Sequence, residues 1–277
     1  MKHLKNAYLF LIFGILYIPI LTLILFSFNS SNSTAEFTGF SLYWYKELFS
    51  NKGEAFTALC NSLILAALSA LLSTLIGTAA AEGIYRMKSK FMKSMVTSVT
   101  NIPMMNPDIV TAMAMMLFFT AVMGMLQIEN KNDFGFITML IAHTTFCLPY
   151  VILSILPRIN ELGDSLSEAA LDLGCTPIEA FFKVKLPNIM PGVISGMIMA
   201  FTLSLDDFII SSFVAPTNFQ TLPLLIYSMT KKRVKPDMYA LSTIIIVSVF
   251  VLLIVSNLKS STAPSSAKSK KKGGAKR

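Results

Sequence analysis

The chain has 277 residues, of which 54% are hydrophobic and only 14% are charged, and it contains 17 Met and 21 Phe. This composition excludes an ordinary soluble domain and indicates a polytopic membrane protein. The formal net charge of +8 arises from 23 basic and 15 acidic residues, and the positions of the basic residues bear on orientation in the membrane.

Six apolar segments are each long enough to cross about 30 Å of hydrocarbon, which takes roughly 20 helical residues. They cover residues 8–28, 59–81, about 108–126, 136–156, 192–215 and 239–258. Pro103 and Pro107 interrupt the apolar run before the third segment, so its start is either a bent helix or a re-entrant segment. The sequence therefore predicts an all-α polytopic membrane protein with six transmembrane helices in residues 1–258 and a basic, low-complexity tail in residues 259–277.

The distribution of Lys and Arg residues predicts that both termini lie in the cytoplasm. They are concentrated in the N-terminal segment, in residues 86–93 and in the tail, which the positive-inside rule assigns to the cytoplasmic side. The loop "KKRVK" at residues 231–235 is an exception, because six spans place it outside. No clear cleavage site follows the first span, so we expect it to be retained in a bacterial cell membrane. The tail is expected to be a solvated end that contacts anionic lipid headgroups, with no nucleic-acid partner.

The sequence contains few of the motifs and residues that enzyme mechanisms require. There is no G-x-x-x-x-G-K-[ST] phosphate loop, so ATP binding by this chain is not expected. His3 and His143 are the only histidines, which leaves no triad or His-based zinc site. Cys60, Cys147 and Cys175 have no paired spacing, so they predict neither a disulfide framework nor a metal site. We expect no catalysis and no cofactor bound by the chain.

A polar segment at residues 165–187 lies between the fourth and fifth spans. Ser165 and Glu168 have the spacing of a capping box, which predicts the start of a short helix. Gly174 is expected to end that helix in a left-handed conformation. Two short helices joined at a glycine are the prediction for this segment.

The second helix of the segment has its own signals. Thr176 and Glu179 form another capping-box pattern with proline at the first helical position, and Pro187 is expected to stop the helix. Helices this short are marginal alone, so their apolar faces require a partner. Either they pack against the protein's own spans or the headgroup layer, or they dock a cytoplasmic protein. The small Ala169 and Ala170 favour docking, because they allow close approach of another surface.

The spacing in this segment resembles the EAA loop of integral-membrane permease subunits in binding-protein-dependent ABC importers. The resemblance implies a type I ABC importer permease-like fold in which the loop is a coupling helix pair contacting an ATPase. It also implies a second homologous permease subunit, a dimer of cytoplasmic ABC ATPases that binds ATP and Mg, and an extracytoplasmic substrate-binding protein. The matching positions, implied to couple to the ATPase, are Glu168, Ala169, Ala170, Gly174, Leu186 and Pro187. We call residues 165–187 the EAA segment.

Small and polar residues recur every three or four positions along the fifth span. They are Gly192, Gly196, Ala200, Ser204, Asp207 and Ser211. Such a stripe marks either close helix packing or a water-lined path.

Asp206 and Asp207 lie at membrane depth, where a carboxylate is costly unless it is paired, hydrated or protonated. Adjacent helical residues point about 100° apart, so these two are not expected to form an aspartyl protease dyad. Either Asp207 makes a structural hydrogen bond to Ser204 or Ser211, or one or both aspartates line a cation pathway with Asp108.

Three further stretches resemble the permease family of spermidine/putrescine importers: "AFTLSLDDFIISSFVAP" at residues 200–216, "NPDIV" at 106–110 and "LPLLIYSM" at 222–229. This resemblance implies polyamine transport, and acidic residues among apolar walls suit a chain of ammonium groups and methylenes. Two alternatives stay open: an ABC permease for another solute such as iron, sulfate or thiamine, and a proton-coupled secondary transporter.

Overall fold

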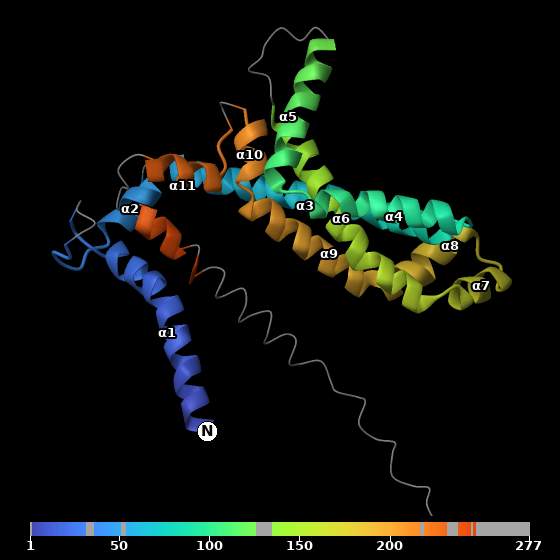
Figure 1. Ribbon diagram of the computed structural model, residues 1–277, viewed down its shortest axis with the longest axis horizontal. Coiled ribbons are helices and arrows are strands. Elements are labelled where there is room, and N and C mark those ends of the chain that lie inside the picture. The colour runs from blue at the N-terminus through green and yellow to red at the C-terminus, as the bar shows by residue number, and fades with distance from the viewer. Residues whose placement is uncertain are drawn as a thin grey trace, which may run out of the picture. The chain divides into compact units, whose positions relative to one another are not determined.

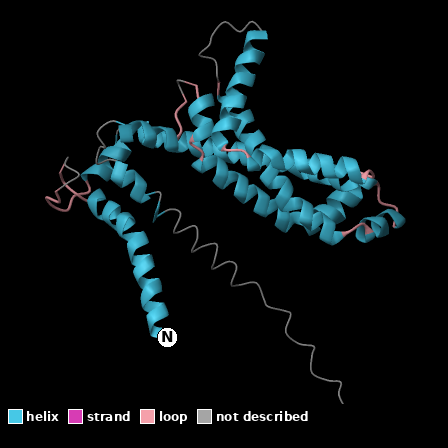
Figure 2. Ribbon diagram, viewed as in Figure 1, coloured by secondary structure: helices cyan, strands magenta, loops and turns pink. Residues whose placement is uncertain are grey.

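The structure, a computed structural model, describes residues 2–31, 36–50, 54–125, 135–216, 219–231, 238–244 and 246–247. These residues form helices joined by short loops, and their one extended pairing is an isolated bridge between Asn29 and Phe40 (Figures 1 and 2). The predicted all-α fold is confirmed. Five helices in the described part of the chain have the length and composition to cross a membrane: Tyr8–Ser27, Phe56–Arg86, Asp108–Met125, Phe136–Leu162 and Pro177–Asp206.

The chain divides into two compact units, of which the first combines Met1–Gly53 with Lys232–Arg277. Its first helix, α1 (Lys2–Ser27), is the first predicted span, and α2 (Tyr43–Ser50) is a short helix held against the end of α1. The Trp44 indole Nε1 donates to the Asn29 carbonyl at 2.8 Å, and the hydroxyls of Ser27 and Tyr45 lie 2.7 Å apart. Residues 238–244 and 246–247 are helical. The remaining residues of the sixth predicted span, the "KKRVK" loop after Lys231 and the tail lie outside the described residues.

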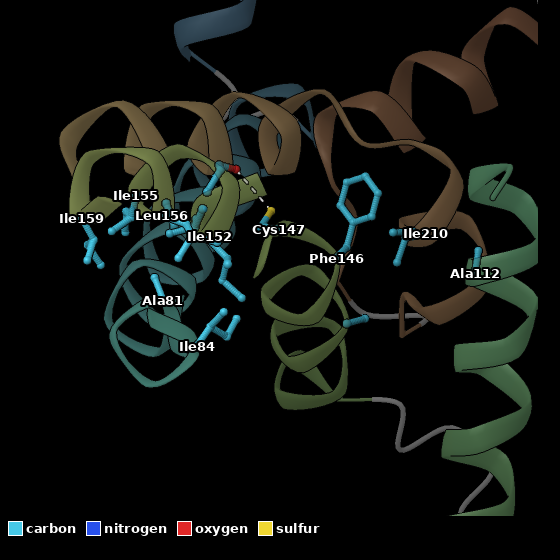
Figure 3. Close-up of a cluster of buried hydrophobic side chains, with 14 of the residues drawn as sticks. Ala81, Ile84, Ala112, Phe146, Cys147, Ile152, Ile155, Leu156, Ile159 and Ile210 are labelled. Carbon is cyan, nitrogen blue, oxygen red and sulfur yellow. Dashed lines mark hydrogen bonds between the residues drawn. The ribbon is translucent and has the colours of Figure 1, made fainter. Parts of the chain in front are cut away.

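The second unit, Glu54–Lys231, is built around three long helices. These are α3 (Glu54–Arg86), α6 (Phe136–Leu162) and α9 (Leu186–Asp206), which pack against one another (Figure 1). The buried cluster in Figure 3 is dominated by aliphatic side chains of α6, including Ile152, Ile155 and Ile159, which lie near Ala81 and Ile84 of α3. The central helix α6 therefore organises this unit.

Glycines let α3 and α9 approach α6 closely. A Cβ on Gly77 would lie 2.7 Å from Val151 Cγ1, and a Cβ on Gly196 would lie 3.3 Å from the Val151 Cα. A Cβ on Gly192 would lie 3.0 Å from the Ser154 carbonyl oxygen. Gly192, Gly196, Ala200 and Ser204 are all buried, so this part of the small-residue stripe serves close helix packing.

The region before the third span is a separate helix. The first helix, α4 (Lys90–Met105), ends before Asn106, whose backbone is extended (φ −84°, ψ 144°), and α5 (Asp108–Met125) begins just after Pro107. The residue before a proline is pushed out of the helical region, which accounts for the break. The bent entry to the third span is thus confirmed as a helix break at Asn106 and Pro107.

The fifth predicted span, residues 192–215, is wrong as a single helix. The helix α9 ends at Asp206, and Asp207 has extended dihedrals (φ −67°, ψ 123°) before α10 (Ile209–Val214) begins. The last described helix of this unit is α11 (Leu222–Lys231). Its start is fixed by the Leu222 backbone N–H, which donates to the Ser62 hydroxyl of α3 at 2.7 Å.

Candidate functional site

The first helix of the EAA segment, α7 (Ser165–Asp172), begins differently from the prediction. Asp164, not Ser165, is the N-cap, and the Glu168 N–H bonds to the Asp164 carbonyl at 2.9 Å. The predicted Ser165–Glu168 capping box is wrong, because Gly163 (φ 67°) ends α6 and lets the chain turn into α7 one residue earlier. Ser165 is then the first helical residue, where its side chain cannot serve as the N-cap.

Gly174 ends α7 as predicted. Its φ is +86°, in the left-handed region that favours glycine. The Cys175 N–H bonds to the Ala170 carbonyl at 3.1 Å and the Gly174 N–H to the Leu171 carbonyl at 2.9 Å, which together form a Schellman motif. A Cβ at Gly174 would meet no atom of the described residues within 4 Å. The backbone conformation, and not space within this chain, is what requires glycine here.

The Thr176 capping box is confirmed. The Thr176 hydroxyl accepts from the Glu179 N–H at 3.3 Å, and the Glu179 carboxylate accepts from the Thr176 N–H at 3.0 Å. Pro177 is the first residue of the short helix α8 (Pro177–Ala180). This end of the EAA segment is fixed by its own local chemistry.

Pro187 does not stop the second helix, so that prediction is wrong. The chain passes from α8 through the π-helix η1 (Phe181–Lys185) directly into α9. The wide turn bonds the Leu186 N–H to the Phe181 carbonyl, and Pro187 then occupies the first turn of α9. A missing N–H is tolerated at that position, so the helix continues.

Apolar side chains of the EAA segment are exposed. The exposed fractions are 87% for Leu173, 71% for Ile178 and 60% for Phe182. Glu168 and Ala169 are exposed as well, whereas Ala170 is buried. In Figure 1, α7 and α8 lie at the end of α6 and α9 that is remote from α5 and α10. The described residues of this chain therefore leave these apolar faces uncovered.

One side chain of the EAA segment is buried and charged. Lys185 is 2% exposed, and its Nζ lies 2.8 Å and 3.0 Å from the two carboxylate oxygens of Glu82 on α3. The same Nζ lies 4.3 Å from the centre of the Tyr85 ring. Sequence reasoning missed this pair; the available signal was that Glu54, Glu82 and Arg86 are the only charged residues of α3.

The break between α9 and α10 is held by Asp207. Its carboxylate oxygens accept from the backbone N–H groups of Ile210 at 3.2 Å and Ser211 at 2.8 Å. These are free donors of the first turn of α10, so the carboxylate stabilises the start of that helix. Asp207 thus makes a structural hydrogen bond, to backbone N–H groups and not to the predicted hydroxyls.

A buried polar network surrounds Asp207. His143 of α6 is fully buried; its Nδ1 lies 2.8 Å from the Ser204 hydroxyl and its Nε2 lies 3.1 Å from the Ser211 hydroxyl. Ser69 of α3 donates to Ser204 at 2.8 Å. If the Ser204 hydroxyl donates its hydrogen bond to Nδ1, the ring N–H is at Nε2. This N–H then faces Ser211 and the Asp207 carboxylate, whose Oδ2 lies 3.6 Å from Nε2. The network joins α3, α6, α9 and α10.

The cysteine of α6 lies next to this network. The Cys147 thiol donates to the Ala200 carbonyl at 3.4 Å, as Figure 3 shows by a dashed line. Cys147 therefore links α6 to α9 by packing and a weak hydrogen bond. Among the described residues, no group of three His, Cys, Asp or Glu side chains could hold a metal ion.

Asp108 and Asp206 differ from Asp207 in being exposed. Asp108 is the first residue of α5, one turn before Ala112. Ala112 and Ile210 of α10 belong to the same buried cluster (Figure 3), and α5 packs against α10. The structure thus brings the helices that carry the aspartates together and leaves two of the three carboxylates uncovered by the described residues.

These features define a class of protein: a polytopic helical membrane protein whose long apolar helices pack through small residues and carry an exposed helix pair at one end. Residues 73–259 match the family described as "Binding-protein-dependent transport system inner membrane component", and the chain belongs to this family of transport permease subunits. The predicted resemblance to ABC importer permeases is thereby confirmed.

Curated relatives span nearly the whole chain. The chain is 39% identical over 255 residues, 92% of this chain and 95% of the relative, to the spermidine/putrescine transport system permease protein PotC of Haemophilus influenzae. It is 39% identical over 240 residues, 87% of this chain and 84% of the relative, to the putrescine transport system permease protein PotI of Escherichia coli K12. A PotC homolog of Mycoplasma genitalium is 31% identical over 251 residues, 88% of this chain and 86% of the relative.

A solved structure shares the fold. A chain from a bacterial ABC transporter that imports the acidic polysaccharide alginate aligns with a TM-score of 0.70 over 95% of this chain and 99% of that chain, at 17% identity. At this identity the likeness concerns the fold alone. It confirms the predicted fold of an ABC importer permease.

Proposed function

We propose that this chain is a permease subunit of a polyamine ABC importer, forms half of the translocation pathway and is driven by separate ATPase subunits. The observation that carries the substrate is the 38% to 39% identity, over most of the chain, to permeases named for spermidine/putrescine and putrescine transport. The exposed acidic residues beside apolar helices are consistent with that substrate class.

The EAA segment is the proposed site of coupling. Glu168, Ala169, Ala170 and Gly174 belong to α7 and its cap, whose apolar neighbours are uncovered by the described residues. Burying such faces against a groove of the ATPase supplies the partner that short helices require. Leu186 and Pro187 then begin α9, so a force on the segment passes into a helix of the core.

The proposed cation pathway runs past Asp108, Asp206 and Asp207. The exposed carboxylates of Asp108 and Asp206 face the passing ammonium groups. Asp207 acts from behind them, because its oxygens already bind the start of α10. It fixes the position of Asp206 at the helix break and adds negative charge to the path.

The chain requires partners for this function. They are a second homologous permease, which completes the pathway, a dimer of cytoplasmic ATPases that binds ATP and Mg, and an extracytoplasmic substrate-binding protein. The permease domain is residues 1–258 in a bacterial cell membrane, with both termini and the 259–277 tail in the cytoplasm. No chemistry and no bound cofactor are assigned to this chain.

Reconstitution tests the proposal. The chain is co-purified with its ATPase and second permease, placed in proteoliposomes and supplied with its binding protein. We expect uptake of labelled spermidine or putrescine that depends on ATP and on the binding protein. Uptake by this chain alone that uncouplers abolish would establish the proton-coupled alternative instead. ATP-dependent uptake of iron, sulfate or thiamine, but not of polyamines, would overturn the substrate assignment.

A further inference from the structure

The Glu82–Lys185 pair joins two elements that lie 103 positions apart in the sequence. Lys185 is the last residue of the π-helix η1, between the exposed part of the EAA segment and α9. Glu82 lies in the final turns of α3. Of the EAA segment's charged residues, Lys185 is the buried one, since Glu168, Asp172 and Lys183 are exposed and Glu179 is partly exposed.

The lysine is held on more than one side. Its Nζ contacts both oxygens of the Glu82 carboxylate, at 2.8 Å and 3.0 Å, and lies over the Tyr85 ring at 4.3 Å. Arg86 also pairs with Glu82, and the Nζ of Lys93 on α4 lies 5.2 Å from the centre of the same Tyr85 ring. Side chains from η1 and from the start of α4 therefore meet Glu82 and Tyr85 at the end of α3.

Stability alone does not account for a buried pair of this kind. Desolvation offsets much of the attraction between buried charges, and an apolar pair of similar size often stabilises a fold as well. The charged pair fixes the position of η1 relative to α3, because its hydrogen bonds join defined atoms. Apolar surfaces, by contrast, can slide past one another. Single π-helical turns inside α-helices are also frequent at functional sites.

We propose that Glu82 and Lys185 are positioning residues that lock the end of the EAA segment to α3, so that displacement of the segment moves α3 and α9 together. The inference rests on the proposed coupling function. Without the lock, the π-helical turn absorbs the displacement, and α9 moves without α3. The two partners differ in what they leave behind: loss of Lys185 leaves Glu82 paired with Arg86, whereas loss of Glu82 leaves a buried ammonium group unpaired.

The test uses the complete reconstituted importer and the ratio of substrate taken up to ATP hydrolysed. Lys185→Met keeps the side-chain length and removes the charge. We expect it to lower this ratio about tenfold while ATPase activity and membrane level stay within about twofold of wild type. Lys185→Arg and the exchange Glu82→Lys with Lys185→Glu restore the pair and are expected to recover most of the ratio. Lys183→Met, which removes an exposed pair with Glu179, is the matched control and is expected to change nothing.

A distance measurement separates locking from simple folding. Spin labels at Gly83→Cys and Asn188→Cys, both exposed positions, report on the end of α3 and the start of α9 in a background without the native cysteines. We expect one narrow distance in the nucleotide-free and ATP-bound importer, and a nucleotide-dependent distance in Lys185→Met. A wild-type distance that changes with nucleotide, or a normal ratio in Lys185→Met, would overturn the inference. Failure of the coupling function itself is distinguished by Gly174→Asp, which would then transport normally.

Discussion

The Nδ1 atom of His143 on α6 lies 2.8 Å from the hydroxyl oxygen of Ser204 on α9, and both side chains are buried. The opposite ring nitrogen reaches Ser211 on α10. A single imidazole thus bridges the two sides of a helix break that lies next to Asp206. The break is built by specific hydrogen bonds, and the following predictions start from it.

Replacement of His143 by leucine should destabilise the protein. The change leaves the hydroxyls of Ser204 and Ser211 without this partner in a buried site, for which we expect a loss of about 2 to 4 kcal/mol in the free energy of unfolding. Thermal unfolding in detergent measures it. Thr145→Leu, an exposed position on the same helix, is the control and should leave the midpoint unchanged. An unaltered midpoint in His143→Leu would show that the network does not hold the break.

Substitutions of the adjacent Asp206 and Asp207 should have different effects on stability and on uptake. Asp207→Ala removes the acceptor of two backbone N–H groups, so we expect a loss of about 1 to 2 kcal/mol, seen as a lower unfolding midpoint. Asp206→Asn should leave the midpoint unchanged and weaken polyamine uptake about tenfold, because an exposed charge on the proposed path is lost. Equal thermal midpoints for the two variants, with equal uptake, would contradict this division of roles.

Gly174 should tolerate asparagine better than valine. Its φ of +86° is accessible to asparagine and strained for a β-branched residue. In the reconstituted importer, Gly174→Val is expected to reduce ATP-driven uptake at least about tenfold, whereas Gly174→Asn retains most of it. Gly83→Val is a comparison at an exposed glycine with no atom of the described residues near its Cβ. Uptake that is normal in Gly174→Val would argue that the α7 cap has no part in coupling.

At the contact between Gly77 and Val151, a smaller residue at position 151 should offset the destabilisation caused by a larger residue at position 77. In Gly77→Ala the new methyl group would lie 2.7 Å from Val151 Cγ1, and we expect a cost of about 1 to 3 kcal/mol in unfolding free energy. Trimming the partner in Val151→Ala should recover part of that cost in the double variant, as a double-mutant cycle measures. Gly124→Ala, where a Cβ meets no atom of the described residues within 4 Å, serves as the control. Strict additivity of the two changes would rule out the close contact.

The sequence predicted features whose causes are local. Apolar runs located the long helices, and the φ requirement of Gly174 and the reciprocal bonds of Thr176 and Glu179 depend on a few neighbouring residues. The break at Asn106 followed from the proline after it. The small-residue stripe left helix packing and a water-lined path open, and the burial of Gly192, Gly196, Ala200 and Ser204 favours packing for that part of it.

Features that depend on distant residues were not predictable in this way. Ser165 has a capping-box pattern, but the exit of α6 through Gly163 moved the cap to Asp164. The apolar run across Asp207 gave no sign that α6 supplies His143 to the helix break. Lys185 follows the exposed Phe182 and Lys183 within two to three residues, and its partner in the buried site is Glu82 of α3.

The uninterrupted passage from α8 through the π-helix into α9 has a mechanical consequence. The helix Pro177–Asp206 has 30 residues, which at about 1.5 Å per residue makes a lever about 45 Å long. A tilt of about 5° about the end that carries Pro177 would displace the end at Asp206 by about 4 Å. A stop at Pro187 would have separated α8 and η1 from α9, whereas the π-turn keeps the helix continuous.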